Sequence, residues 1–463
     1  MKANRVTVFA ALFCMPLAAT AEVNATEINQ IAADWQRVCG APGSAVGIVQ
    51  DGKLIYSQGF GVMSLATQQR PDKRTSFLIG SLTKQFAAGG IILLKREGKV
   101  KLDDPITKYI PSAPSSWSDI TLNHLLHHTS GLFNYTDIAV SMISPKPFTL
   151  SDVIKVTSGQ KRKTKPGEAF EYCNTGYYLL GSVIEAVTKK PYFDYLNTKI
   201  FKPLGMSRTY IYRRSIPRPY EAIGYSDAPN RFLPPNEVTP GAAGNLASTV
   251  EDLAKWDAAL YGNDLFTKEE KALMWTPFTL NSGAKSDYGM GWGVGNEGDL
   301  PVVEHGGGIP GFTTYIKRFL NEKTTIIVLK NSMNGSSPSD LVTQISLRII
   351  PKLAKLSEGI PDDNTQLTAR TLNFARSLIA NNPDRSQMSD EANKGLTPQL
   401  VRQVSQQFEP YGPLSKLTLL KRESTNGTII STYLATFPTV SLKLMVSVNS
   451  EGKFAGIRFL PFP

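Results

Sequence analysis

Residues 77–86 of the chain, FLIGSLTKQF, place a serine three positions ahead of a lysine, after an apolar run and a glycine. The pattern that follows is amphipathic to Gly98, which predicts a long helix beginning at Ser81. Side chains three positions apart share a helix face, with Cβ atoms about 5–6 Å apart, so Lys84 would lie over Ser81. Free N–H groups at a helix start also favour developing negative charge.

Two interpretations of this stretch are open. Ser81 and Lys84 either begin a nucleophile site or form a helix cap with a lysine that reaches solvent along its stem. Ser-x-x-Lys recurs at Ser158, Ser282 and Ser450, in polar, glycine-containing stretches that predict loops or turns. The motif alone therefore does not distinguish a nucleophile site from a helix cap.

The N-terminal segment has the pattern of a signal peptide. Residues 1–21 contain two basic residues, an apolar run and the small residues ATA before Glu22. The run is too short and too proline-broken to span a membrane. We expect cleavage after Ala21 and a secreted or periplasmic protein.

The remaining composition is that of a globular protein. The chain has 463 residues, 41% of them hydrophobic, and a formal net charge of +11. Its basic residues are scattered except for KRKTK at 161–165, which favours a solvated loop over a patch for polyanions. Nothing in the sequence indicates nucleic-acid binding. Cys39 and Cys173 follow the predicted cleavage site, and either two free buried thiols, the favoured interpretation, or one bridge is compatible with the sequence.

Strand patterns come from both ends of one large unit. Residues 45–61 form two apolar runs around Asp51-Gly52, and residues 311–331 repeat this around NEK, so both predict hairpins. Helical spacing is found at 27–39 and 337–353. We therefore expect an α+β fold, in which an antiparallel sheet from the first and last segments lies beside a mostly helical insertion.

A second unit follows a segment rich in Gly, Pro, Asp and Asn. We predict a catalytic domain at 22–355, a linker at 356–365 and a small α+β accessory domain at 366–463. Within the last, helices are expected at about 366–380 and 397–408, followed by four strands. No histidine and no catalytic cluster occurs there.

Two further motifs carry chemistry. Tyr172-Cys-Asn174 stands in a predicted turn before a helix, where the alternative is a loop tyrosine packed on that helix. His305 precedes three glycines, which would let a ligand lie close to the backbone, and the alternative is a glycine turn with an incidental histidine.

Taken in order, Ser81-x-x-Lys84, Tyr172-x-Asn174 and His305-Gly-Gly307 resemble the pattern of serine β-lactamases and penicillin-recognising hydrolases. The stretches GKVKLDDPITKYIP, ITLNHLLHHTSGL, GAAGNLASTVEDLAKW and YGMGWGV also resemble the branch of class C β-lactamases, D-aminopeptidases and esterases. The resemblance covers roughly residues 27–355 and implies a β-lactamase-like fold. The tail resembles only loosely a cone-shaped α+β accessory domain.

The resemblance implies a mechanism that needs no metal or organic cofactor. Ser81 would attack a carbonyl to form an acyl-enzyme, and its proton would go to Lys84 or Tyr172. Their ordinary pKa values, about 10.4 and about 10, are too high for a base at neutral pH, so proximity and burial must shift at least one. Which of them is the base stays open, since the two would titrate together.

The remaining implied roles concern binding. Asn174 would orient Lys84 and the substrate amide, and the N–H groups of Ser81 and Gly308 would form the oxyanion hole. The predicted catalytic residues are Ser81, Lys84 and Tyr172, and the predicted substrate-binding residues are Asn174, His305, Gly307 and Gly308.

His305 departs from the β-lactamase pattern. A lysine there would offer a permanent cation to a substrate carboxylate, whereas a histidine is mostly neutral at pH 7. This favours an esterase or D-amino-acid peptidase acting on small molecules, short peptides or peptidoglycan. The alternatives are a β-lactamase and a non-catalytic peptidoglycan- or penicillin-binding module.

Three other features are assigned structural roles. His124, His127, His128 and Asp137 could suggest a metal site, but the stretch matches a structural loop of the family beside the cleft. Cys173 is a spacer in the family pattern. The sequence HGGG also occurs in α/β-hydrolases, yet this chain has no Gly-x-Ser-x-Gly elbow.

Overall fold

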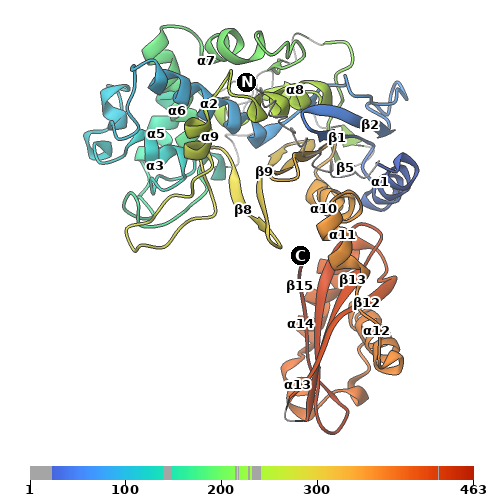
Figure 1. The fold of residues 1–463 in the computed structure, drawn as a ribbon. Coiled ribbons are helices and arrows are strands. Elements are labelled where there is room, and N and C mark those ends of the chain that lie inside the picture. Colours follow the sequence, from blue (N-terminus) through green and yellow to red (C-terminus); the bar gives the residue numbers. More distant parts are fainter. Residues whose placement is uncertain are drawn as a thin grey trace, which may run out of the picture.

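The computed structural model describes residues 23–138, 148–213, 216, 218–227, 230–231, 241–425 and 427–462. A larger α+β body is followed by a smaller α+β unit that projects from it (Figure 1). The predicted signal peptide lies outside the described residues. Within those residues, no helix combines the length and the apolar character needed to cross a bilayer.

The main sheet joins the two ends of the large body, as predicted. Its antiparallel strands follow the order β2–β1–β11–β10–β9–β8, and Val46 of β1 pairs with Val328 of β11. The strands are β1 (Gly43–Gln50), β2 (Lys53–Gly61), β8 (Gly293–Glu297), β9 (Leu300–Ile309), β10 (Phe312–Phe319) and β11 (Thr324–Lys330). This arrangement confirms the predicted α+β fold, with hairpins at Asp51-Gly52 and at NEK.

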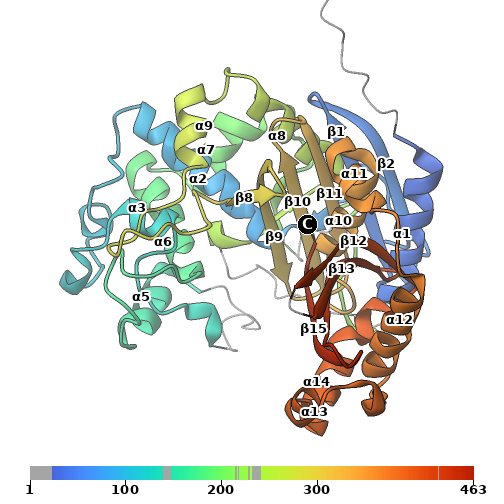
Figure 2. The ribbon, with the colours of Figure 1, turned by 60° about the horizontal axis from the view of Figure 1, so that its bottom comes forward.

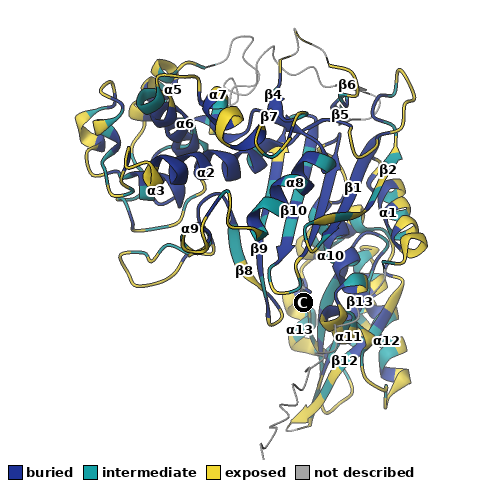
Figure 3. Ribbon diagram, turned by 45° about the horizontal axis from the view of Figure 1, so that its top comes forward, coloured by how far each residue is buried: buried dark blue, intermediate teal, exposed yellow. Residues whose placement is uncertain are grey.

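Both faces of this sheet are covered by helices. Val46 and Ile48 of β1 face an apolar cluster with α1 (Ala25–Cys39) and α10 (Pro338–Ile349). Ala45 and Val49 belong to the cluster with α2 (Thr83–Arg96) and α8 (Val250–Tyr261) on the other side. Because neighbouring strand residues point to opposite faces, this double covering explains the near-continuous apolar run of β1. Figure 3 shows the central strands buried along most of their length.

A mostly helical region lies between β2 and β8 in the chain and packs beside the sheet (Figure 2). Its α2 packs on α6, where Gly90 leaves room for the side chains of Ile184 and Leu196. Ser158 ends helix α5, so the prediction that it lies in a loop or turn was wrong. The other elements here are α3 (Leu122–Leu126), α5 (Leu150–Ser158), α6 (Asn174–Thr188), α7 (Tyr192–Leu196), α9 (Lys268–Met274), β3 (Phe77–Leu78), β4 (Tyr210–Ile211), β5 (Tyr225–Asp227), β6 (Asn230–Arg231) and β7 (Leu246–Ser248).

The helix expected over 337–353 is two helices. α10 ends at Ile349, and α11 (Pro351–Glu358) begins after Ile350, which has an extended backbone. Ile350 precedes a proline, and that position disfavours the helical conformation. The predicted linker at 356–365 therefore includes the last residues of α11. The domain boundaries themselves stay a prediction.

The C-terminal unit is a four-stranded antiparallel sheet with helices on one face. Its elements are α12 (Thr365–Ile379), α13 (Asp390–Gly395), α14 (Pro398–Phe408), β12 (Lys416–Thr425), β13 (Thr428–Thr436), β14 (Ser441–Val448) and β15 (Phe454–Pro461). These confirm the predicted helices and strands. Phe374 stacks on Phe454 in its own core, whereas Leu434 and Phe462 pack into the cluster of α1 and α10. The unit is thus attached to the face of the main sheet that does not carry Ser81.

Candidate active site

Ser81 lies in a tight turn between a short strand and a buried helix. β3 leads into a 3₁₀ turn at Gly80–Leu82, and α2 follows. Gly80 has φ +52°, and a Cβ there would lie 2.9 Å from the nitrogen of Gly308, so this turn needs glycine. The N-cap of α2 is Leu82, without a side-chain cap, and Lys84 is 0% exposed. Both parts of the structural alternative, a serine cap and a solvent-reaching lysine, are therefore wrong.

Among the described residues, the amine of Lys84 contacts three oxygens, none of which belongs to a carboxylate. Its Nζ lies 2.9 Å from Ser81 Oγ, 2.8 Å from Asn174 Oδ1 and 2.7 Å from the carbonyl oxygen of Ala243. Burial lowers the pKa of Lys84 well below its ordinary value. Two of the three oxygens can only accept hydrogen bonds. In its neutral form, which burial favours, the amine can donate its two N–H groups to Asn174 and Ala243 and turn its lone pair toward the Ser81 hydroxyl.

Tyr172 covers this amine from the solvent side. Its ring centroid is 4.8 Å from Lys84 Nζ, and the ring lines the cavity in front of Ser81. Burial raises the pKa of Tyr172, and a hydrogen bond with Ser81 only partly opposes this. The two groups that the sequence left as candidate bases thus shift in opposite directions. At neutral pH the phenol keeps its proton.

The turn that carries Tyr172 and Asn174 is held by the loop around His128. The N–H of Cys173 donates to His128 Nδ1 at 3.0 Å, and the ring of His128 lies 4.3 Å from the ring of Tyr172. His128 is 1% exposed and has φ +56°, an uncommon conformation for a residue with a side chain. Asn174 donates through its side-chain Nδ2 to Thr136 Oγ1 at 2.9 Å, which aims its Oδ1 at Lys84.

His305 is buried at the opposite wall of the cavity. Its Nδ1 is 2.6 Å from the carbonyl oxygen of Gly306, and its Nε2 is 2.7 Å from the hydroxyl of Tyr288. A carbonyl can only accept, so Nδ1 carries the proton and Nε2 accepts from Tyr288. Burial lowers the pKa of His305 to about 3. The ring is therefore neutral at pH 7, and both its nitrogens are used by the protein.

The glycines after His305 belong to strand β9, which is paired with β10 and packed against the Ser81 turn. The alternative of a glycine turn with an incidental histidine was therefore wrong. A Cβ at Gly307 would lie 2.1 Å from the carbonyl oxygen of Ile79, to which Thr314 Oγ1 donates at 3.0 Å. Gly308 lies where β9 comes closest to Gly80. The backbone around Ser81 and Gly308 is thus side by side, where the oxyanion hole was predicted.

These groups surround one cavity of about 410 Å³. Lys84 stands behind it, in contact with the serine oxygen. The residues lining the cavity are Ser81, Tyr172, Tyr288, Gly293, Glu304, His305, Gly306 and Tyr315. A serine hydroxyl, a buried amine and a phenol therefore meet at one accessible point.

The other residues weighed in the sequence have structural contacts. His124 is part of a capping box with Thr121, and His127 Nδ1 lies 3.0 Å from the carbonyl oxygen of Asn123. In the part of the chain that the structure describes, no three His, Cys, Asp or Glu side chains are grouped as a metal site. Cys39 and Cys173 are buried free thiols, which confirms the favoured interpretation.

Sequence reasoning missed three contributors to the site. The carbonyl of Ala243 carries no residue-type signature, although GAAGNLAS had been noted as a family stretch. His128 and Tyr288 lie in the noted stretches HHTSGL and YGMGWGV, but no spacing rule joins them to Tyr172 or His305. Only the folded chain brings these segments together.

Comparisons with known proteins agree with this geometry. A family model described as Beta-lactamase matches residues 28–347. Penicillin-binding protein 4* of Bacillus subtilis (strain 168) is 32% identical over 321 residues, which are 65% of this chain and 70% of that protein. D-amino acid amidase from Ochrobactrum anthropi SV3, solved with L-phenylalanine amide, has a TM-score of 0.62 and 27% identity over 72% of this chain and 99% of its own.

A third similarity extends into the C-terminal unit. The octameric penicillin-binding protein homologue from Pyrococcus abyssi has a TM-score of 0.62, covering 92% of this chain and 96% of its own. At 22% identity this likeness concerns the fold alone.

Proposed function

This chain belongs to the beta-lactamase family, and we propose that it is an exported serine hydrolase that cleaves ester or amide bonds through an acyl-enzyme on Ser81. The family membership and the shared fold confirm the resemblance that the three motifs indicated. The observation that carries the proposal is the arrangement of Lys84. Both N–H groups of its neutral amine are occupied by carbonyl-type oxygens, which leaves the lone pair for the proton of Ser81.

Acylation then proceeds as a balanced proton transfer. The Ser81 hydroxyl gives its proton to Lys84 Nζ while Oγ bonds to the substrate carbonyl carbon. The carbonyl oxygen gains negative charge beside the N–H groups of Ser81 and Gly308, and one such donor contributes about 3–4 kcal/mol in the transition state. As the bond to the leaving group breaks, the leaving atom takes a proton from the Lys84 ammonium, with the phenol of Tyr172 adjacent.

Deacylation reverses these roles with water. A water molecule gives a proton to Lys84 and attacks the ester of Ser81. The bond between Oγ and the carbonyl carbon breaks, and Oγ regains the proton. No step requires a group outside the chain other than substrate and water.

The substrate class follows from His305. A neutral ring with both nitrogens bonded to the protein offers no cation to a substrate carboxylate. This argues for esters, amides or D-amino-acid peptides over β-lactams. Support for D-amino-acid substrates comes from the amidase of Ochrobactrum anthropi, whose name states that activity.

The main experiment is labelling with a fluorophosphonate probe, followed by a panel of short esters, D-alanyl peptides and a chromogenic cephalosporin. We expect labelling of wild type, none of Ser81→Ala, and full labelling of Ser158→Ala, which removes an exposed serine of another Ser-x-x-Lys. Labelling that persists in Ser81→Ala would refute the nucleophile. A wild type with neither labelling nor turnover would favour a non-catalytic peptidoglycan-binding module.

Export is tested separately. The proposal expects that the mature protein recovered outside the cytoplasm begins at Glu22, as judged by N-terminal sequencing. A mature protein that starts at Met1 and stays in the cytoplasm would contradict export and leave the hydrolase proposal standing.

A further inference from the structure

Glu304 lines the same cavity as Ser81 but has no part in the proposed mechanism. It lies on β9 opposite Gly293, the residue at which β8 begins, so no side chain stands across from it on that strand. Its side chain is 31% exposed. From Gly308 to Glu304 is four residues along a strand, or about 13 Å. A substrate group well removed from the reacting carbonyl could therefore reach this carboxylate.

The charges around Glu304 do not cancel. The ammonium of Lys317 lies 3.1 Å from Glu304 Oε2 and also contacts the buried carboxylate of Glu297. One cation is thus shared by two carboxylates, which leaves one negative charge in excess. Since Glu297 is 5% exposed and Lys317 is 12% exposed, the excess charge faces the cavity through Glu304.

Among the described residues that line the cavity, no lysine or arginine offsets this charge. The eight lining residues include one carboxylate side chain, Glu304, and one histidine, His305, whose pKa burial lowers to about 3. Burial also lowers the pKa of Lys84 behind the wall, which disfavours its charged form. The remaining large lining side chains are the rings of Tyr172, Tyr288 and Tyr315. Aromatic faces with a carboxylate are a favourable surrounding for an ammonium group and an unfavourable one for a carboxylate.

We propose that the Glu304 end of the cavity is a subsite for a substrate ammonium group, formed by the Glu304 carboxylate and the ring of Tyr315 beside it. This inference rests on the proposed function, because it assigns a cationic substrate class to that same site. The competing reading is that Glu304 only ties β9 to β10 through Lys317.

Matched substrates that differ in one charge test the subsite. The first pair is N-acetyl-D-alanyl-L-lysine amide and its norleucine counterpart, with the ammonium beyond the scissile bond. The second pair is the p-nitroanilides of Nα-acetyl-D-lysine and Nα-acetyl-D-norleucine, with the ammonium on the acyl side. For at least one pair we expect wild type to favour the cationic member about tenfold in kcat/KM, the size of a half-exposed charge pair together with a cation–π contact. The preference should weaken as salt is raised.

Variants assign that preference to its residue. Glu304→Gln keeps the shape of the side chain and should bring the ratio close to one. Asp299→Asn is the matched control. It removes a 78% exposed carboxylate from the turn between β8 and β9, and it should leave the ratio within about twofold of the wild-type ratio. Ratios near one for both pairs in wild type, or an equal loss in both variants, would overturn the subsite.

Binding keeps this test separate from catalysis. Calorimetric titration of the four compounds into Ser81→Ala measures the same ratios without turnover. If wild type hydrolyses nothing but Ser81→Ala prefers the cationic members, the proposed function fails and the ammonium subsite stands. If hydrolysis occurs with no charge preference in either assay, the subsite fails and the hydrolase stands.

Discussion

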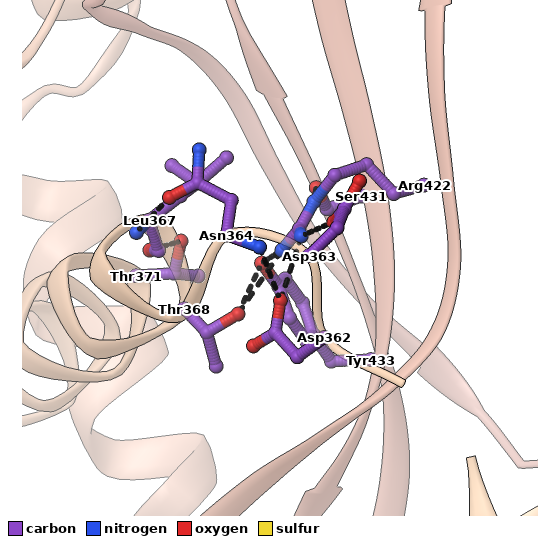
Figure 4. Close-up of polar contacts among 9 residues, drawn as sticks. All are labelled: Asp362, Asp363, Asn364, Leu367, Thr368, Thr371, Arg422, Ser431 and Tyr433. Atoms are coloured by element: carbon purple, nitrogen blue, oxygen red, sulfur yellow. Dashed lines mark hydrogen bonds and ion pairs between the residues drawn. The ribbon is translucent and has the colours of Figure 1, made fainter. Parts of the chain in front are cut away.

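Two nearly buried basic side chains of this protein have opposite surroundings. Lys84 contacts three neutral oxygens, and burial lowers its pKa. Arg422 on β12 contacts the carboxylates of Asp362 and Asp363, and it also donates to Tyr433 (Figure 4). Although burial opposes it, the hydrogen bonds to Asp362 and Tyr433 raise the pKa of Arg422. A buried basic group with counter-ions stays charged and links the segments that carry them. A buried lysine without counter-ions favours its neutral, nucleophilic form.

The positions of the two groups fit this difference. Arg422 joins the segment before α12 to the C-terminal sheet, since it also donates to Thr368 of α12 and Ser431 of β13 (Figure 4). Lys84 links α2 to Asn174 and Ala243. These two contacts also hold the amine in place for the proposed proton transfer from Ser81. Replacing Lys84 by an apolar residue of similar length should therefore reduce turnover, whereas the same replacement of Arg422 should reduce stability.

The largest effect is expected for Lys84→Met. Loss of a positioned base typically costs 10²–10⁴-fold, so kcat/KM for a short ester should fall by about 10³-fold. The fold should survive, because the substitution leaves no unpaired charge. The measurement is steady-state hydrolysis together with thermal unfolding at pH 7. Near-normal turnover in a folded Lys84→Met would show that another group takes the Ser81 proton.

Arg422→Met should change stability and leave turnover intact. Removing one partner of a buried pair costs about 3–5 kcal/mol, and we expect about 2 kcal/mol because Asp363 is 77% exposed. Denaturant unfolding of the intact protein measures the loss. Lys421→Met is the control, since this neighbouring lysine is 63% exposed and should change the free energy of unfolding by less than about 0.5 kcal/mol. If Arg422→Met and Lys421→Met lowered the free energy of unfolding equally, the ion pairs of Arg422 would not stabilise the fold and its contrast with Lys84 would fail.

The contrast also separates what the sequence could predict from what it could not. The spacing of Ser81 and Lys84 predicted that they lie one turn apart, and apolar runs at both ends predicted the sheet, because these signals are local. The carbonyl of Ala243 and the ring of His128 complete the site from distant loops, and a backbone oxygen or a left-handed histidine has no pattern to read. The sequence likewise predicted that at least one of Lys84 and Tyr172 must shift its pKa, but not that the two pKa values would shift in opposite directions.

A smaller effect is expected where a cation is added to the wall opposite Lys84. His305→Lys would place a potential cation in the cavity and should raise β-lactam acylation relative to short-ester hydrolysis by about tenfold. The ratio is measured with a chromogenic cephalosporin and a nitrophenyl ester. His305→Gln, which stays neutral, is the matched control and should leave the ratio unchanged. An unaltered ratio in His305→Lys would mean that the neutral histidine does not set the substrate class.

The smallest expected effect is a change with pH in the difference in unfolding free energy between wild type and Lys84→Met. In the unfolded chain Lys84 titrates near 10.5, whereas in the folded protein its pKa is lowered. Between these two pKa values the unfolded state binds one more proton, so the free energy of unfolding contributed by Lys84 rises with pH. The slope is at most about 1.4 kcal/mol per pH unit. Lys84→Met should therefore match or exceed wild type in stability at pH 7 and lose that advantage toward pH 10. A difference that stays constant from pH 7 to 10 would mean that the folded protein holds Lys84 charged, as it holds Arg422, and that the amine is no base.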